Sequence, residues 1–267
     1  MTLMAAMLPL LALAGELENY WQKVFSQNGR TQLMYSSIEE ENGCHLVWTI
    51  TTFDTASAQE TAMTTFGENE YVYMLKTLEA YNNEWTRVTT KSITTYGKNG
   101  QVLSSASSDQ DDWIHITPES HDEILRDWAR CLYKINHINR ASVSGSLEKL
   151  FSSVDRTSYA NPIIVYDDGY FFVWATITND TENRRNSDLH FFGTTEEVVK
   201  VKYLYIFNST WTDTRILQAA IYGKADKRLG TLTYPKGTWH QVSDTELFTA
   251  LRDFAKSKYK PENAPRK

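Results

Sequence analysis

The chain has 267 residues, a formal net charge of −6, and 41% apolar and 13% aromatic residues. This length holds one large domain or two small ones, each with a packed core. The small negative charge argues against general nucleic-acid binding, and the apolar content argues against extensive disorder.

The first predicted element is a signal peptide over residues 1–14. An apolar run from Leu8 ends in Ala12-Leu13-Ala14, directly before Gly15, and this small-x-small pattern is typical of a cleavage site. The run is shorter than the roughly 20 apolar residues that a membrane span needs. A buried N-terminal helix is the alternative. We therefore expect an exported protein, in the periplasm or at the cell surface, without a membrane span after cleavage.

An internal repeat organises the rest of the chain. Sliding the sequence by 126 residues aligns residues 20–134 with 146–260 without a gap, and more than a quarter of the positions are identical, against roughly 6% by chance. Three tryptophan pairs share this offset: Trp48 with Trp174, Trp85 with Trp211, and Trp113 with Trp239. We therefore expect two tandem domains, residues 16–137 and 146–263, joined by a linker at 136–145.

Each repeat begins with strands. Residues 44–50 alternate, with Cys44, Leu46 and Trp48 on one apolar face, which is the period of a half-buried strand. Residues 54–67 are polar and show no periodicity, so we expect a long loop there. The other strands expected are 32–38, 70–80, 85–96 and 101–106 in the first repeat, and 158–165, 196–207 and 211–222 in the second.

The period changes to that of a helix at the end of each repeat. Thr117-Pro118 has the pattern of an N-cap followed by proline, and Ser243-Asp244-Thr245-Glu246 that of a capping box. We expect helices at 118–135 and 244–259, the first with an apolar stripe formed by Ile124, Trp128, Cys131 and Ile135. The predicted fold class is α+β, with two tandem domains, each a five- or six-stranded antiparallel sheet with a C-terminal helix packed on one face.

Several short motifs carry a family resemblance. In the first repeat they are Trp21, Val47-Trp48, the strand of Lys76, and the segment Trp113-x-x-Ile116-x-Pro118-x-Ser120-x-x-Glu123-x-Leu125. In the second repeat Asn161-Pro162 precedes a strand and Trp239 repeats Trp113. On these residues each repeat resembles the surface-adhesin protein E family of Gram-negative bacteria. The resemblance implies a helix on the concave face of a sheet, and adhesion through binding of host matrix or serum proteins.

The resemblance also bears on the two cysteines, because the family ties its helix to its sheet with a disulfide. Cys131 matches the helix cysteine, but the partner position is Asn83, and the second repeat has Ser209 and Ser257 at these places. Cys44 lies on the apolar face of its strand, so we suggest a Cys44–Cys131 bridge. Two buried thiols are the alternative.

The sequence contains no recognisable catalytic or metal-binding motif. None of the six histidines recurs at the repeat offset or pairs at metal-ligand spacing, so we expect scattered surface histidines. Asp109, Asp111 and Asp112 lack the glycine and final glutamate of a calcium loop. We therefore expect a protein that is not an enzyme and has no cofactor. A strongly shifted carboxylate in a deep pocket would favour an enzyme instead.

The second repeat carries a possible basic docking surface. Residues 16–141 sum to a charge of −8, but residues 142–267 sum to +2. The basic residues on the expected loop and around a hairpin are Arg184, Arg185, Lys224, Lys227 and Arg228. Ordinary solubility charge is the alternative. We expect an exported binding protein for a protein or extracellular-matrix ligand. The alternative is a periplasmic envelope protein with a structural or assembly role.

Overall fold

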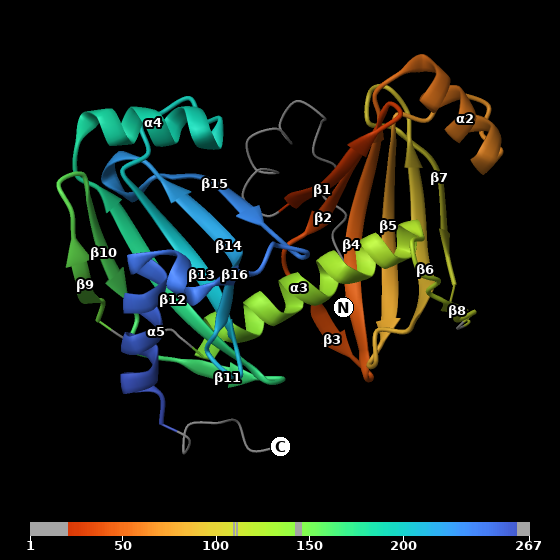
Figure 1. Ribbon diagram of the computed structural model, residues 1–267. Helices are drawn as coiled ribbons and strands as arrows, with labels where there is room; N and C mark the ends of the chain where they lie inside the picture. The colour runs from red at the N-terminus through yellow and green to blue at the C-terminus, as the bar shows by residue number, and fades with distance from the viewer. Residues whose placement is uncertain (1–20, 109, 111, 142–145, 261–267) are drawn as a thin grey trace. The chain divides into compact units, whose positions relative to one another are not determined.

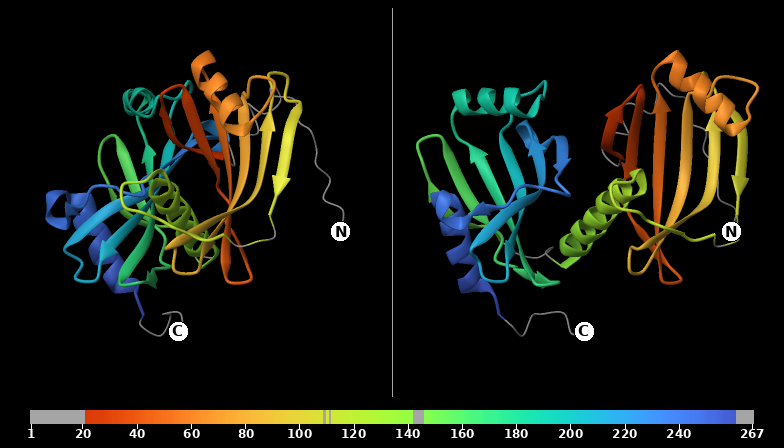
Figure 2. Two further views of the ribbon diagram at one scale, coloured as in Figure 1. Left: turned by 90° about the vertical axis from the view of Figure 1, so that its right-hand side faces the viewer. Right: turned by 45° about the vertical axis from the view of Figure 1, so that its right-hand side comes forward.

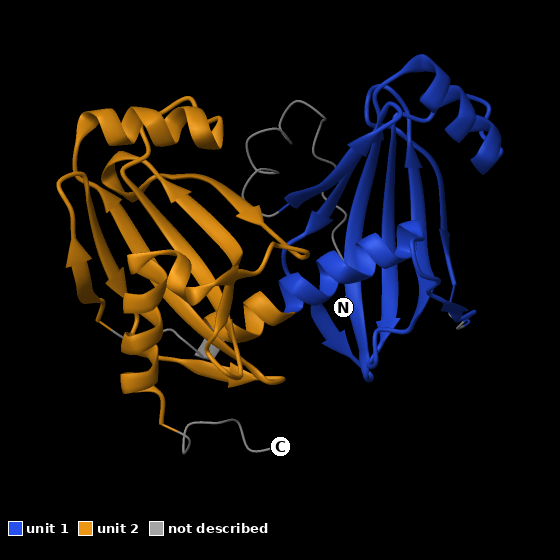
Figure 3. Cartoon of the chain, in the orientation of Figure 1, with its two compact units in different colours: residues 1–133 blue, residues 134–267 orange. Residues whose placement is uncertain are grey.

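The computed structural model describes residues 21–108, 110, 112–141 and 146–260, so the expected signal peptide lies outside the described residues. The chain forms two compact units, residues 1–133 and 134–267 (Figure 3). Their boundary falls within a helix, α3 (His121–Ala141), and not in the expected linker. Within the described residues, no helix has both the length and the apolar character of a membrane span.

Unit 1 is built on an antiparallel sheet of eight strands (Figure 1). They are β1 (Trp21–Gln27), β2 (Arg30–Tyr35), β3 (Glu39–Glu41), β4 (Cys44–Phe53), β5 (Met74–Asn82), β6 (Arg87–Tyr96), β7 (Val102–Ser107) and β8 (Ile114–His115). Six of them follow the order β1-β2-β4-β5-β6-β7, while β3 pairs with β4 and β8 with β6. The expected number was five or six, and the expected ranges omit β1, β3 and β8. Strands β3 and β8 have only three and two residues, too few to show alternation, whereas β1 has seven residues and was missed.

Unit 2 repeats this sheet 126 residues later. Its strands are β9 (Glu148–Ser152), β10 (Arg156–Ala160), β11 (Val165–Asp167), β12 (Tyr170–Asn179), β13 (Lys200–Asn208), β14 (Asp213–Tyr222), β15 (Arg228–Thr233) and β16 (His240–Gln241), with short 3-10 turns at η1 (Lys224–Asp226) and η2 (Val242–Asp244). The order β15-β14-β13-β12-β10-β9 is that of unit 1 read from the other edge, and β11 and β16 take the places of β3 and β8. The two sheets therefore share one topology.

The prediction of a long loop over residues 54–67 is wrong, because most of this range forms a helix. Helix α2 (Ala56–Phe66) begins after Thr55, whose hydroxyl accepts a hydrogen bond from a backbone N–H of the first turn, and ends at Gly67 in the left-handed region. Helix α4 (Glu182–Phe192) has the same two caps in unit 2. Each lies across one end of its sheet (Figure 2). The apolar period was absent because only two small alanines of α2 are buried.

Helix α3 joins the core of unit 1 through a face that includes part of the expected stripe, since Cys131 and Ile135 are buried and Trp128 packs against the core. Leu125, Ala129 and Leu132 share a buried cluster with Val47 and with other residues of the sheet. Ile124, which was expected in the stripe, is 41% exposed. The helix begins at His121, three residues later than expected, because Ser120 rather than Thr117 accepts the capping hydrogen bond.

Helix α5 (Glu246–Lys258) has the corresponding place in unit 2. Leu251 and Ala255 share a buried cluster with Val173 and Phe207 of the sheet. The Thr245 hydroxyl accepts a hydrogen bond from a first-turn amide, so the helix begins two residues after the expected start. In both units the last helix of the repeat therefore contributes to the core of its own sheet.

Candidate functional site

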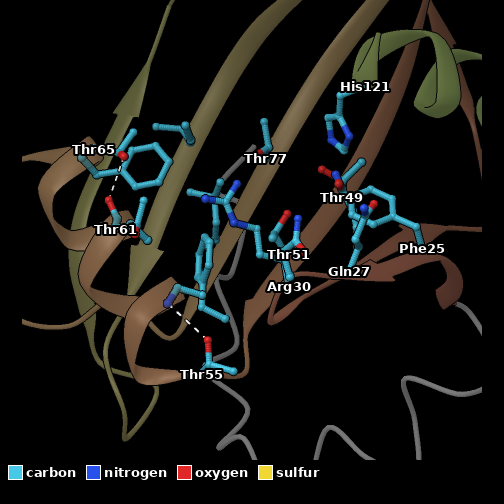
Figure 4. A pocket seen from close by; sticks show the side chains of 18 of the residues that line it. Phe25, Gln27, Arg30, Thr49, Thr51, Thr55, Thr61, Thr65, Thr77 and His121 are labelled. Atoms are coloured by element: carbon cyan, nitrogen blue, oxygen red, sulfur yellow. Dashed lines mark hydrogen bonds between the residues drawn. The ribbon is translucent and has the colours of Figure 1, made fainter. Parts of the chain in front are cut away.

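Unit 1 contains a cavity of about 740 Å³ on the helix-covered face of its sheet. We call it the unit 1 pocket; it lies between α2, the first residue of α3 and strands β1, β2, β4, β5 and β6 (Figure 4). Gln32, Thr49 and Thr77 line the pocket from the sheet and are at most 8% exposed. Volumes of this size accommodate small organic ligands.

The wall of the unit 1 pocket is both polar and aromatic. Helix α2 contributes Thr61 and Thr65, whose hydroxyls donate to backbone carbonyls one turn earlier. Each hydroxyl oxygen therefore keeps lone pairs that can accept a further hydrogen bond. Apolar surface comes from the rings of Phe25, Phe53 and Phe66. The pocket can thus contact an apolar ligand body and also hydrogen-bond to polar groups on it.

Arg30 is the cationic residue of the unit 1 pocket. Its guanidinium carbon lies 5.7 Å from the centre of the Phe53 ring, within the range of a cation–π contact. Arg30 is exposed and forms no ion pair with any residue that the structure describes. Its charge is therefore available to a ligand in the pocket.

Glu79 is the acidic residue of the unit 1 pocket. Its carboxylate is half-buried and accepts a 2.8 Å hydrogen bond from the Tyr81 hydroxyl. Burial raises the pKa of Glu79 to about 7, although the Tyr81 hydrogen bond lowers it, and the nearby charge of Asp122 raises it further. A carboxyl group in this range can both donate and accept a proton near neutral pH.

His121 lies at the first residue of α3 and completes the pocket. Its ring meets the Phe25 ring edge-on, with centroids 4.9 Å apart. Desolvation lowers the pKa of His121, Asp122 raises it, and the positive charge of Arg30 lowers it. His121 is therefore held toward its neutral form in the pocket.

The corresponding part of unit 2 is filled by larger side chains. Tyr203 and Tyr205 stand where unit 1 has Thr77 and Glu79. The two tyrosine rings lie 5.7 Å apart, and Tyr205 also packs on Phe248 of α5. Tyr205 is only 2% exposed. The duplicated fold therefore has polar groups around a cavity in one copy and aromatic packing at the same positions in the other.

The cysteines do not form the suggested bridge, since Cys44 is a half-buried thiol and Cys131 a buried one. The geometric reason given for the bridge is wrong. Val47 belongs to the cluster that contains α3 residues, and side chains alternate along a strand. Cys44 and Trp48 therefore point to the opposite face, where Lys76 lies 4.4 Å above the Trp48 ring.

The expected basic surface is neutralised in part by carboxylates. Arg185, on α4, and Lys224 both form ion pairs with Glu197, at 3.2 and 3.4 Å. Lys227 pairs with Glu196. The structure thus brings three of the predicted cations together, but around two anions, which reduces the attraction for an acidic partner.

The other two basic residues lie elsewhere in unit 2. Arg184 pairs with Asp188 on its own helix. Arg228 lines a smaller cavity of about 370 Å³ together with Lys202 and Trp174. The five residues therefore do not form one docking surface.

The expectation of surface histidines is wrong for His45. Its side chain is 3% exposed and stacks on Trp85 at 4.2 Å between ring centroids. Burial lowers the pKa of His45. Phe171 stacks on Trp211 in the same way in unit 2, so His45 takes an aromatic core position.

No metal centre is formed by the described residues, among which no three histidine, cysteine or acidic side chains are placed to hold a metal ion. Asp109 and Asp111 of the rejected calcium motif lie outside the described residues. Sequence reasoning missed Arg30, Glu79 and His121 as site residues. The repeat alignment could have indicated Glu79 and His121, through the unlike pairs Glu79/Tyr205 and His121/Leu247, but not Arg30, which is matched by Arg156.

Comparison with known proteins adds no family assignment. No protein-family model matches the chain, and no curated protein is significantly similar to it. The resemblance to the surface-adhesin protein E family is therefore a prediction that rests on the motifs alone.

Proposed function

We propose that this chain is an exported, non-enzymatic binding protein and that its unit 1 pocket is the ligand site. The observation that carries the proposal is the divergence of the two repeats. They share topology, caps and the core tryptophan pair Trp85 and Trp211. However, Thr77 and Glu79 line a cavity where Tyr203 and Tyr205 pack against one another. Among the described residues, unit 2 has the same scaffold with aromatic packing at these positions, and unit 1 has the scaffold with a cavity there.

The polar side chains on the sheet wall support a binding role for the unit 1 pocket. Gln32, Thr49 and Thr77 are each at most 8% exposed and line the pocket. None of their side-chain nitrogen or oxygen atoms is among the buried atoms without a hydrogen-bond partner in the described residues. Amide and hydroxyl groups can both donate and accept hydrogen bonds, so these side chains can bind polar groups of a molecule in the pocket.

The wider role follows the motif resemblance. We propose adhesion at the cell surface through a protein or extracellular-matrix ligand. The alternative is an envelope protein with a structural or assembly role in the periplasm. Protease treatment of intact cells separates the two, because it removes a surface adhesin and spares a periplasmic protein.

Filling the unit 1 pocket tests whether it is the ligand site. Thr77→Tyr introduces the side chain that unit 2 has at this position, and Ser107→Tyr on the exposed edge strand β7 is the matched control. A set of charged and neutral small organic fragments is added to the full chain and followed by saturation-transfer NMR. We expect T77Y to lose fragment binding and S107Y to keep it. The same binding profile for the wild type and T77Y would refute the proposal.

One observation favours an acid–base enzyme as a second candidate, namely the raised pKa of Glu79. In the described pocket, however, no hydroxyl or thiol hydrogen-bonds to His121, the pairing that would activate a nucleophile. Glu79→Gln separates the two candidates. An enzyme would lose turnover of a bound fragment, whereas a binding protein leaves the fragment chemically unchanged with either residue.

A further inference from the structure

A buried carboxylate on α4 holds an arginine in unit 2. Arg156 Nη2 lies 3.4 Å from Oδ1 of Asp188, which is 4% exposed. Arg184 also pairs with this oxygen, and Asn179 Nδ2 donates to the other carboxylate oxygen at 2.9 Å. Unit 2 therefore fills the space between its sheet and α4 with one carboxylate and the three side chains that bind it.

Unit 1 has the corresponding arginine but not the corresponding carboxylate. Arg30 is the counterpart of Arg156 at the repeat offset, but Ala62 stands where unit 2 has Asp188. Ala58 and Phe53 likewise stand in the places of the other two partners, and all four of these residues line the unit 1 pocket. The cation thus remains beside a cavity at the position where the second repeat holds an acid.

We propose that the unit 1 pocket binds a small organic acid whose carboxylate pairs with Arg30 and takes the place of the Asp188 side chain. This inference rests on the proposed function of the pocket and names the chemical class of its ligand. The planar guanidinium of an arginine matches a carboxylate through two parallel hydrogen bonds. The apolar body of the acid then lies against Phe25, Phe53 and Phe66.

The other charges in the pocket are compatible with an acid at this end. Arg30 pairs with Phe53 along β4, and Glu79 pairs with Val47 on the other side of that strand. Phe53 and Val47 are six residues apart on β4, which corresponds to about 20 Å along the strand. Besides Arg30 and Glu79, the titratable residue that lines the pocket is His121, which carries no negative charge in either form. Asp54, which follows Phe53, accepts hydrogen bonds from Thr31 and Thr52 and does not line the pocket. The acidic end of the pocket is therefore distant from the proposed carboxylate.

A matched pair of probes tests the charge of the ligand. We choose 4-phenylbutyrate and its neutral analogue 4-phenylbutanamide, which have the same aromatic body and differ in the acid group. Each is titrated against the full chain, with the dissociation constant measured by ligand-observed NMR. For the wild type we expect the acid to bind at least tenfold more tightly than the amide.

Two variants locate the effect, and a third is the control. Arg30→Gln removes the cation from an exposed position and should abolish the preference for the acid. Ala62→Asp introduces the carboxylate of unit 2 beside Arg30 and should weaken acid binding at least tenfold. Arg87→Gln changes an exposed arginine outside the pocket and should preserve the tenfold preference.

The outcomes distinguish this inference from the proposed function. Equal binding of acid and amide, both abolished by T77Y, would overturn the carboxylate inference and leave the pocket as a ligand site. A preference for the acid that persists in R30Q would also overturn it. Binding of neither probe would overturn it as well, while fragment binding sensitive to T77Y would still support the pocket.

Discussion

Replacing Glu79 with glutamine should make unit 1 more stable at neutral and alkaline pH. The glutamine side chain cannot ionise, but its amide oxygen can still accept the hydrogen bond that the Tyr81 hydroxyl donates to Glu79 at 2.8 Å. The variant therefore removes the titration and keeps the contact. Its effect should depend on pH, because the Glu79 carboxylate becomes charged in a desolvated position.

The size and sign of the effect follow from the pKa of Glu79, which rises from 4.5 to about 7 on folding. Each pKa unit corresponds to 1.36 kcal/mol, so the full effect is about 3 kcal/mol. The folded wild type binds the Glu79 proton more tightly than the unfolded chain does. Protonation of Glu79 therefore stabilises the folded wild type fully below pH 4.5, and this stabilisation is lost as the pH rises through 7. Relative to wild type, the free energy of unfolding of E79Q should therefore rise by this amount across the window.

Urea denaturation of the full chain at several pH values between 4 and 8.5 measures this difference. Other groups titrate in both proteins, so they cancel when the wild-type curve is subtracted from the E79Q curve. Glu41→Gln at an exposed position of β3 is the control for the loss of one carboxylate from the chain. Parallel stability curves for E79Q and wild type would refute the assignment of a raised pKa to Glu79.

Three further predictions concern caps and ion pairs. Thr55→Ala and Thr181→Ala each remove a side-chain N-cap and should lower the free energy of unfolding by about 1 kcal/mol in urea titrations. Asp188→Ala leaves two partly buried arginines without their anion and should cost about 2 kcal/mol in the same assay. The double change Glu196→Gln and Glu197→Gln releases three cations, so this variant should elute from heparin at higher salt than wild type. Elution at the same salt would show that these ion pairs do not limit binding.

The repeat offset made the architecture predictable. Every strand of unit 1 has a counterpart 126 residues later, and each regular alternation was found within a few residues of its strand. Helix α2 was missed because it buries only Ala58 and Ala62 and so lacks an apolar stripe. Its capping residues were visible, however, since Thr55 and Gly67 recur as Thr181 and Gly193.

The face of β4 that carries the core could not be read from its alternation. Cys44, Leu46 and Trp48 are the more apolar set, yet the face beside α3 has His45, Val47 and other residues of the opposite parity. Polar residues occupy that face because it also forms the unit 1 pocket, where Thr49 is 2% exposed. On this face of β4, the polar lining of the cavity therefore reverses the usual relation between polarity and burial.

The same reversal leads to a prediction about the cysteines. Cys44 points away from the sheet face that α3 covers, and Cys131 is buried on that helix, so the sheet separates the two side chains. A bridge requires Cα atoms within about 7 Å of each other. We therefore expect two titratable thiols in the unfolded, unreduced chain, and an unchanged urea midpoint for unit 1 when a reductant is added. A bridge would close a loop of nearly ninety residues and contribute roughly 4 kcal/mol, so a large fall of this midpoint on reduction would contradict the placement of Cys44.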